Sequence, residues 1–233
     1  MVSERLVDLL DEGLLGLRLA VPAEPGAVAR SRQPAMCPTC GARAAGSHRF
    51  CARCGRALGA VLRPSAEGTV TIAFTDIEDH TSLLQRHTRT DVQELMAVHN
   101  AAVRRQVSDN GGFEVKFLGD GFMLAFPSAR AAIRCAIGVQ RALADHNRSN
   151  ADGRIRVRVG LNSGDAVREG DDFFGLAVSF AARVMEKARG GEILVAELTR
   201  GLAGSWTGVA FRDRGAHRMK GFPGRHRLYE VEW

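Results

Sequence analysis

The sequence Thr69-Val-Thr-Ile-Ala-Phe-Thr-Asp76-Ile-Glu78 decides the fold of this chain, together with Phe113-Glu-Val-Lys116-Phe-Leu-Gly-Asp120-Gly-Phe-Met-Leu-Ala-Phe126. β-Branched and aromatic residues dominate both runs, which predicts strands buried in a core. A carboxylate at the tip of a core strand is costly unless a cation or a hydrogen-bond donor meets it. If neighbouring strands bring Asp76 and Asp120 together, their oxygens suit Mg²⁺ or Mn²⁺. Taken alone, either aspartate also fits a turn or a helix cap.

Strands and helices are predicted to alternate around these two runs. The glycine-rich stretch 118–121 predicts a tight hairpin between two of the strands. Strands separated by crossing helices indicate an α+β fold, in which helices cover one face of a mainly antiparallel sheet. The expected strands are 69–75, 113–118, 121–126, 154–162, 192–196 and short ones near 208–212 and 226–232, and the expected helices are about 79–87, 90–109, 128–147, 176–189 and 197–203.

Length and charge narrow the class of protein. A chain of 233 residues fits one catalytic-size domain and a small appendage. No apolar run approaches the roughly 18 residues that span a bilayer, and the start Met-Val-Ser-Glu-Arg does not fit a secretory signal, so we expect a cytoplasmic protein that does not enter membranes. The net charge is +6 overall, −3 over residues 1–25 and +7 over residues 26–63, which leaves +2 for residues 64–233.

Four of the five cysteines form two closely spaced pairs, Cys37-x₂-Cys40 and Cys51-x₂-Cys54. In a reducing compartment this spacing predicts one structural Zn²⁺ held by four thiolates rather than disulfides. The alternative is four unrelated or redox-active cysteines. The fifth, Cys135, lies in an apolar helical pattern and is expected to be a small buried hydrophobe.

Three regions follow from these patterns. Residues 1–36 are expected to hold a helix and a linker, residues 37–63 a zinc-ribbon-like segment and a second linker, and residues 64–233 the large domain. The helix, over 3–19, has a leucine face but is weakened by two glycines, so we expect it to need a partner surface. Its face consists of Leu6, Leu10, Leu14 and Leu17.

Four motifs of the large domain resemble those of the class III nucleotidyl cyclases, in order and spacing, over residues 66–233. They are Phe-Thr-Asp76-Ile-Glu, Lys116-x₃-Asp120-Gly, Asp172-Phe-Phe-Gly175-x₂-Val-Ser179-x₂-Ala-Arg183 and Met-Lys220-Gly. A Cys₄ ribbon ahead of the domain also resembles an arrangement in bacterial cyclases. The resemblance implies a ferredoxin-like βαββαβ core and an adenylate cyclase, a phosphorus–oxygen lyase that converts ATP to 3′,5′-cyclic AMP and pyrophosphate.

The resemblance also implies two Mg²⁺ or Mn²⁺ ions per active site. Asp76 and Asp120 match the metal carboxylates, and the backbone carbonyl of Ile77 is a plausible further ligand. Two ions placed between them activate the ribose hydroxyl, hold the α-phosphate and neutralise the departing pyrophosphate. The sequence offers no convincing nucleophilic triad and no phosphate-binding Gly-Lys-Ser/Thr loop.

The remaining motif residues are implied to bind the nucleotide. Lys116 and Asp172 match the pair that recognises adenine, because an ammonium donates to N1 and a carboxylate accepts from the 6-amino group. Arg183, in an environment expected to be largely buried, matches the residue that contacts the phosphates in the transition state. Lys220 matches the lysine that closes over the triphosphate. Ser179 stands where the family commonly has an asparagine that orients the ribose.

The family builds each active site from two subunits, so a head-to-tail homodimer with shared sites is expected. One alternative is a weak or inactive pseudo-cyclase that senses nucleotides, which Ser179 supports. Another makes the arginine-rich ribbon a nucleic-acid-binding unit. Because only Phe50 offers an aromatic ring for stacking there, we do not expect nucleic acid as a partner.

Overall fold

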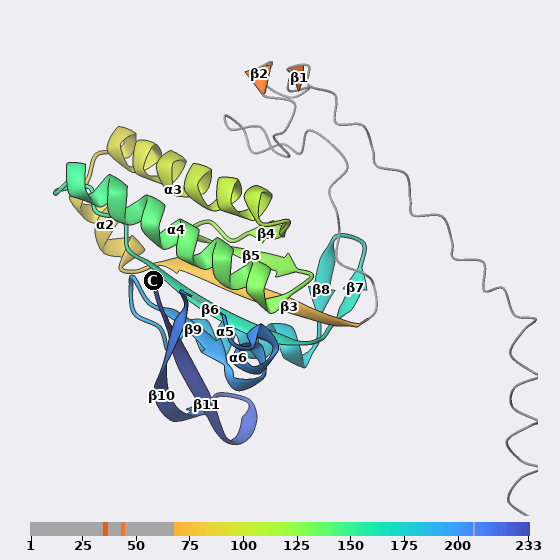
Figure 1. Cartoon of the computed structure of the whole chain (residues 1–233). Coiled ribbons are helices and arrows are strands. Elements are labelled where there is room, and N and C mark those ends of the chain that lie inside the picture. Colours follow the sequence, from red (N-terminus) through yellow and green to blue (C-terminus); the bar gives the residue numbers. More distant parts are fainter. Residues whose placement is uncertain (1–34, 37–42, 45–67, 207) are drawn as a thin grey trace, which may run out of the picture. The chain divides into compact units, whose positions relative to one another are not determined.

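A seven-stranded sheet forms the centre of the large domain (Figure 1). The computed structural model describes residues 35–36, 43–44, 68–206 and 208–233. The strand order is β10-β11-β9-β6-β3-β5-β4, and every neighbouring pair is antiparallel except β6 and β9. The strands are β3 (Thr69–Ile77), β4 (Phe113–Phe117), β5 (Gly121–Phe126), β6 (Val157–Asp165), β9 (Ile193–Ala196), β10 (Ala210–Met219) and β11 (Phe222–Glu232).

Five helices connect these strands in the part of the large domain that the structure describes. They are α2 (His80–Arg86), α3 (Arg89–Asp109), α4 (Ala129–Ser149), α5 (Leu176–Met185) and α6 (Glu197–Ala203). The order β3-α3-β4-β5-α4-β6 with the spatial arrangement β6-β3-β5-β4 is that of a ferredoxin-like βαββαβ core. The predicted α+β class with a mainly antiparallel sheet is confirmed.

Helices cover both faces of the sheet, so the prediction of one covered face was wrong. Along β5, the side chains of Phe122, Leu124 and Phe126 pack in the cluster that includes α3 and α4. Met123 and Ala125, which point the opposite way, pack with residues of α5. A strand that is apolar at every position needs cover on both faces, and the run Phe122–Phe126 carried that signal.

The C-terminal strands are longer than expected, and one hairpin was missed. β10 and β11 pair from Ala210↔Glu232 to Met219↔Phe222, so the stretch between the two expected strands is reduced to a turn at Lys220 and Gly221. Pro223 is tolerated in β11 because only Leu228–Glu230 also pair with β9, so the proline lies where one side of the strand is unpaired. A small hairpin of β7 (Val167–Glu169) and β8 (Asp172–Phe174) precedes α5.

One short strand ends the region predicted to be a helix and linker, and a second lies in the segment predicted to be a zinc ribbon. β1 (Ala35–Met36) pairs antiparallel with β2 (Arg43–Ala44). The four paired cysteines, the helix expected over 3–19, its linker and the boundary expected at 63/64 all fall outside the described residues. Among the helices that the structure describes, none is long and apolar enough to cross a membrane.

Candidate active site

The backbone holds Asp76 and Asp120 next to each other at one end of the β3–β5 pair. Asp76 is the register partner of Gly121, and the Ile77 N–H donates to the Asp120 carbonyl at 3.1 Å. Gly121 is required for this approach, because a Cβ there would lie 1.8 Å from the carbonyl oxygen of Thr75. The turn of the predicted hairpin, which joins β4 to β5, therefore holds Asp120 beside Asp76 on β3.

A guanidinium from the neighbouring strand neutralises Asp76. Arg158, the register partner of Asp76 on β6, places Nε at 2.7 Å and Nη2 at 2.6 Å from Asp76 Oδ2. Burial raises the pKa of Asp76 most, the nearby Asp120 raises it further, and the Arg158 hydrogen bond offsets part of this increase. Sequence reasoning missed Arg158, although a basic residue inside the apolar β6 was a visible signal.

The donor set at this place fits a divalent cation. It offers the carboxylates of Asp76 and Asp120 and the backbone carbonyl of Ile77, all oxygen ligands of the kind that Mg²⁺ takes. Within the described ranges, no three His, Cys, Asp or Glu side chains form a complete ligand set. That is usual for Mg²⁺, which keeps waters and substrate phosphates in its coordination shell.

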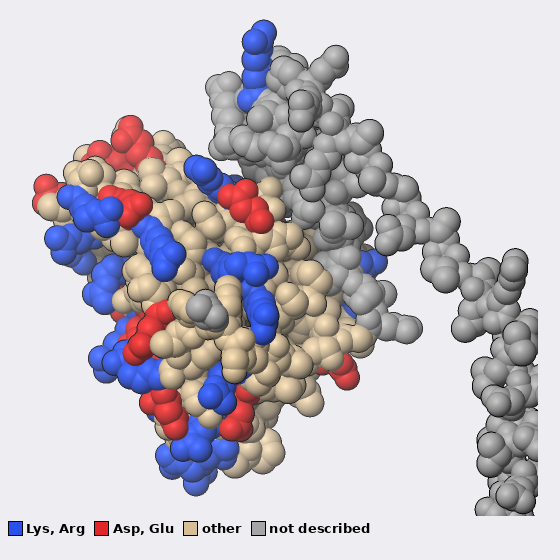
Figure 2. Space-filling model, viewed as in Figure 1, with Lys and Arg blue, Asp and Glu red and all other residues tan. Residues whose placement is uncertain are grey.

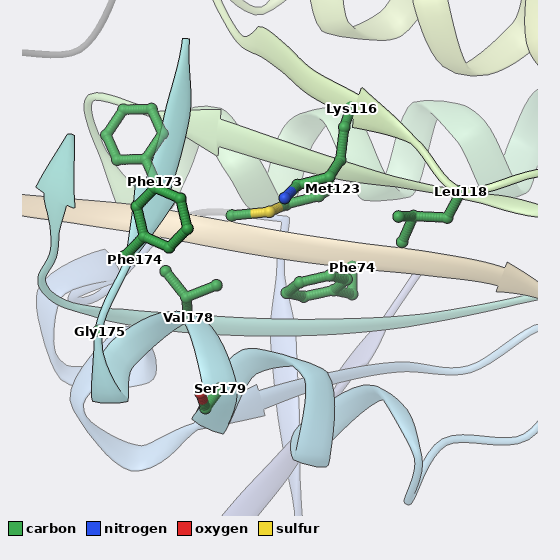
Figure 3. Close-up of a pocket in the computed structure, with 9 residues that line it drawn as sticks. All are labelled: Phe74, Lys116, Leu118, Met123, Phe173, Phe174, Gly175, Val178 and Ser179. Atoms are coloured by element: carbon green, nitrogen blue, oxygen red, sulfur yellow. The ribbon is translucent and has the colours of Figure 1, made fainter. Parts of the chain in front are cut away.

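A pocket of about 240 Å³ is lined by Lys116 (Figure 3), whose predicted partner Asp172 directly precedes the lining residue Phe173. Lys116 Nζ donates to Asp172 Oδ2 at 2.6 Å, which joins β4 to β8. A β-bulge between Glu114 and Lys116 makes Lys116 the register partner of Met123, on the pocket side of the sheet. The apolar part of the lining consists of Phe74, Leu118, Met123, Phe173, Phe174 and Val178.

The charged pair lies against an aromatic wall. Lys116 Nζ is 5.9 Å from the centroid of the Phe174 ring. Partial burial raises the pKa of Asp172, but hydrogen bonds from Lys116 and from the Phe173 N–H outweigh it, and the net pKa is lowered. A few charged groups on apolar walls are typical of a small-molecule site. The sequence analysis quoted the run Asp172-Phe-Phe as part of a motif, but it did not predict that these phenylalanines form a wall of the pocket.

The other predicted residues lie on α5 and at the β10–β11 turn. Ser179 lines the pocket and is exposed. Arg183 pairs with Glu186 and has 32% of its side chain exposed, so the expectation of a largely buried environment was wrong. The reason is the helix register: Ala181 and Val184 face the core, and Arg183 does not. Lys220 is exposed at the turn.

The site residues therefore form two groups in one chain. One is the carboxylate pair with Arg158; the other is the Lys116–Asp172 pocket with Ser179. No hydrogen bond or ion pair between described residues links Arg183 or Lys220 to the carboxylate pair.

An α+β sheet with a carboxylate pair at one place and a charged, apolar-walled pocket at another has the layout of a nucleotide cyclase domain. The chain belongs to the family of the adenylate and guanylate cyclase catalytic domain, whose family model matches residues 62–232.

Individual proteins show the same similarity. Over 154 residues the chain is 36% identical to an adenylate cyclase of Mycosarcoma maydis, covering 56% of this chain and 6% of that protein. Over 173 residues it is 33% identical to an uncharacterized protein of Mycobacterium bovis, covering 74% of this chain and 44% of that protein. The chain thus spans less than half the length of these curated relatives. The crystal structure of an adenylate/guanylate cyclase/hydrolase from Silicibacter pomeroyi matches with a TM-score of 0.65 at 27% identity, covering 70% of this chain and 96% of that chain.

Proposed function

We propose that this chain is an adenylate cyclase that converts ATP to 3′,5′-cyclic AMP and pyrophosphate. The observation that carries the proposal is the pairing of Asp172 with Lys116, which lines the apolar pocket. An ammonium and a carboxylate, side by side, match the acceptor N1 and the donor 6-amino group of adenine. Guanine presents the opposite pattern on that edge, and leaving buried charged groups unpaired costs about 1–3 kcal/mol each.

The cation site is proposed to hold two Mg²⁺ or Mn²⁺ ions on Asp76, Asp120 and the Ile77 carbonyl. When bound, such ions activate the 3′-hydroxyl and neutralise the charge of the leaving pyrophosphate. Arg158 is proposed to keep the carboxylate pair ionised and to leave Asp76 for an incoming triphosphate. A guanidinium is suited to both roles, because it binds carboxylates and phosphates in the same bidentate way.

Three further residues are proposed to act on the substrate. Arg183 would contact the phosphates in the transition state, and Lys220 would close over the triphosphate. Ser179 would orient the ribose, through a bridging water where the hydroxyl is too short to reach.

A head-to-tail homodimer is proposed because no hydrogen bond or ion pair between described residues joins the two groups of site residues within one chain. Exposed Ser179 and Lys220, and half-buried Arg183, are free to face a second copy. In this arrangement a monomer lacks activity, and two equivalent sites form per dimer.

The test is turnover with Mn²⁺ and either ATP or GTP, for the native chain and for Asp120→Ala. Cyclic AMP from the native chain, with little cyclic GTP and no product from the variant, supports the proposal. The second candidate is a nucleotide-sensing pseudo-cyclase, which Ser179 in the pocket lining favours. Nucleotide binding with no product from either chain would support the second candidate instead.

We also propose that residues 37–63 bind one structural Zn²⁺. The β1–β2 pairing supports this, because Ala35–Met36 and Arg43–Ala44, which flank the first cysteine pair in the sequence, pair with each other. Zinc analysis is expected to give one equivalent per chain, lost in Cys37→Ser. Cys135 should stay unreactive toward thiol reagents after chelation, since burial raises its pKa, while four other thiols react.

The cytoplasmic location expected from the sequence stays a prediction.

Nucleic acid is not proposed as a partner. On the face of the large domain in Figure 2, acidic side chains lie between the basic ones over the described residues, rather than leaving one basic patch. A gel shift with mixed DNA and RNA at low salt would overturn this expectation if a complex formed.

A further inference from the structure

We propose that His80 is a third protein ligand of the cation held by Asp76 and Asp120, and that its imidazole makes this site prefer Mn²⁺ to Mg²⁺. The inference rests on the proposed function, because it requires a divalent cation between the two carboxylates. It adds a residue outside the four cyclase motifs and names the metal that the site would select.

The distance between His80 and Asp120 suits two ligands of a single ion. His80 Nδ1 lies 3.6 Å from Asp120 Oδ2, which is too long for a normal hydrogen bond. Two ligands bound at about 2.1 Å and at right angles lie roughly 3.0 Å apart. His80 does not yet complete a ligand set with Asp76 and Asp120 in the described residues, so the proposal requires the side chains of His80 and Asp120 to move closer together when the cation binds. Their side chains are 23% and 35% exposed, which leaves room for an ion and its waters.

The backbone before His80 takes an unusual conformation that places the imidazole here. Asp79 has φ 55° and ψ 33°, and within the described ranges it is the one non-glycine residue with a positive φ. Its side chain makes no capping hydrogen bond at the start of α2, so capping does not account for the conformation. Strained residues of this kind persist where the surrounding structure requires them, most often at functional sites.

The segment from Asp76 to His80 is held in place at its central residue, Glu78. The Glu78 N–H donates to the Arg156 carbonyl at 2.8 Å, and Glu78 Oε1 accepts from the Gly190 N–H at 2.7 Å. Because hydrogen bonds hold both the backbone and the side chain of Glu78, the backbone position of His80 relative to the two carboxylates is fixed before a cation binds.

The identity of the third ligand sets the metal preference. Mg²⁺ takes oxygen ligands and surrenders its waters reluctantly, whereas imidazole is a ligand of first-row transition metals. A histidine beside two carboxylates therefore adds affinity for Mn²⁺ and little for Mg²⁺. If His80 only oriented Asp120 without touching the ion, its removal would weaken both metals alike.

The test is pulsed electron paramagnetic resonance of Mn²⁺ bound to the full, uniformly ¹⁵N-labelled chain with 3′-deoxy-ATP. This nucleotide lacks the hydroxyl needed for cyclisation, and its nitrogens are ¹⁴N, so a ¹⁵N coupling reports a protein ligand. We expect ¹⁵N coupling in the native chain and in the control His87→Ala, which alters the other end of α2, and no coupling in His80→Ala or His80→Phe. Calorimetric titration should show about tenfold weaker Mn²⁺ binding in the His80 variants, with Mg²⁺ binding changed by less than about twofold.

The possible failures separate the two proposals. Mn²⁺ bound without ¹⁵N coupling in the native chain, or with coupling that persists in both His80 variants, overturns the role of His80. Loss of Mn²⁺ binding in Asp120→Ala would still support the cation site in that case. If the native chain binds no Mn²⁺ at all, both the cation site and the role of His80 are wrong. His80→Phe retains a ring of similar size, so at least one His80 variant is expected to fold.

Discussion

Lys116 Nζ donates to Asp172 Oδ2 at 2.6 Å, and Lys116 lines the pocket proposed to receive the purine. Both side chains are partly exposed, at 42% and 31%, and exposed ion pairs of this kind contribute about 0–1 kcal/mol. Separating them to admit a base therefore costs less than the penalty for mispairing with the wrong base. The selectivity of the pocket should depend on the donor and acceptor pattern, and little on the stability of the pair.

Exchanging the two charges tests this directly. The double variant Lys116→Glu, Asp172→Lys keeps an ion pair but reverses its pattern, which then matches the N1–H donor and O6 acceptor of guanine. We expect kcat/KM for ATP to fall by at least about thirtyfold, because both groups are then mispaired at about 1–3 kcal/mol each, with a relative gain for GTP. In each single variant, kcat/KM for ATP should fall and kcat/KM for GTP should not rise. An unchanged ATP to GTP ratio in the double variant would contradict the role of this pair.

Arg158 should stabilise the fold mainly by neutralising Asp76. Arg158→Ala leaves a mostly buried carboxylate beside Asp120 without its cation, so we expect a loss of about 1–3 kcal/mol in the free energy of unfolding at pH 7. Millimolar Mn²⁺ should restore part of this loss, because a bound cation replaces the guanidinium. Thermal or urea unfolding with and without Mn²⁺ measures both effects.

The matched control for that experiment is Arg156→Ala. Arg156 lies two residues earlier and pairs with Glu78, with 59% of its side chain exposed. Its removal should cost less than about 1 kcal/mol and should show no extra Mn²⁺ rescue. Equal rescue of the two variants would mean that the cation does not act at Asp76.

His99 should make the domain sensitive to acid. It is fully buried, its Nε2 has no partner among the described residues, and desolvation lowers its pKa to about 4. The unfolded chain, with an ordinary pKa near 6.5, therefore binds a proton first as the pH falls, and stability is lost between about pH 6.5 and pH 4. The total loss should be about 3 kcal/mol.

The variant His99→Phe removes this titration and keeps a ring beside Phe122, whose centroid lies 5.7 Å from that of His99. Urea unfolding at half-unit steps from pH 4.5 to pH 7.5 should show a shallower dependence of the unfolding free energy on pH in the variant. If the variant kept the full slope, other groups would be responsible for the acid sensitivity.

Two glycines should respond in opposite ways to the same substitution. Gly121→Ala places a methyl group 1.8 Å from the Thr75 carbonyl and should cost at least about 3 kcal/mol, because β3 and β5 must separate. Gly201→Ala, in the interior of α6 with open space around the new Cβ, should gain about 0.5–1 kcal/mol. Chemical unfolding of both variants checks the contrast, and a mild effect at Gly121 would show that the strand pair adapts.

Local patterns were enough to predict most of the fold. β-Branched and aromatic runs located β3 and β5 within two residues, and helix α6 was predicted with its observed bounds. The hairpin β7–β8 was missed because strands of three residues show no measurable alternation. The strand β5 was correctly predicted to be buried; the error about the covered faces came from assigning helices to one face of the sheet alone.

Only part of the candidate site could be predicted from the sequence. Asp76 and Asp120 could be placed together in advance because each follows a strand-like run and both match the metal carboxylates of one family. In the structure they meet because β3 pairs with β5, and the hairpin from β4 to β5 holds Asp120. Arg158 and His80 could not be placed in advance, since their positions depend on strand register and on the left-handed conformation of Asp79. Motif reading also misjudged Arg183, whose exposure is set by the orientation of α5 on the sheet.

The β4–β5 hairpin carries Lys116 on one of its strands and Asp120 in its turn, four positions apart. In the proposed dimer, these two residues serve different substrate molecules, one through its base and the other through its phosphates. If binding of the first nucleotide displaces this hairpin, the affinity of the second active site for its nucleotide should change. Saturation curves that depart from hyperbolic shape would be the natural signature of this mechanical link.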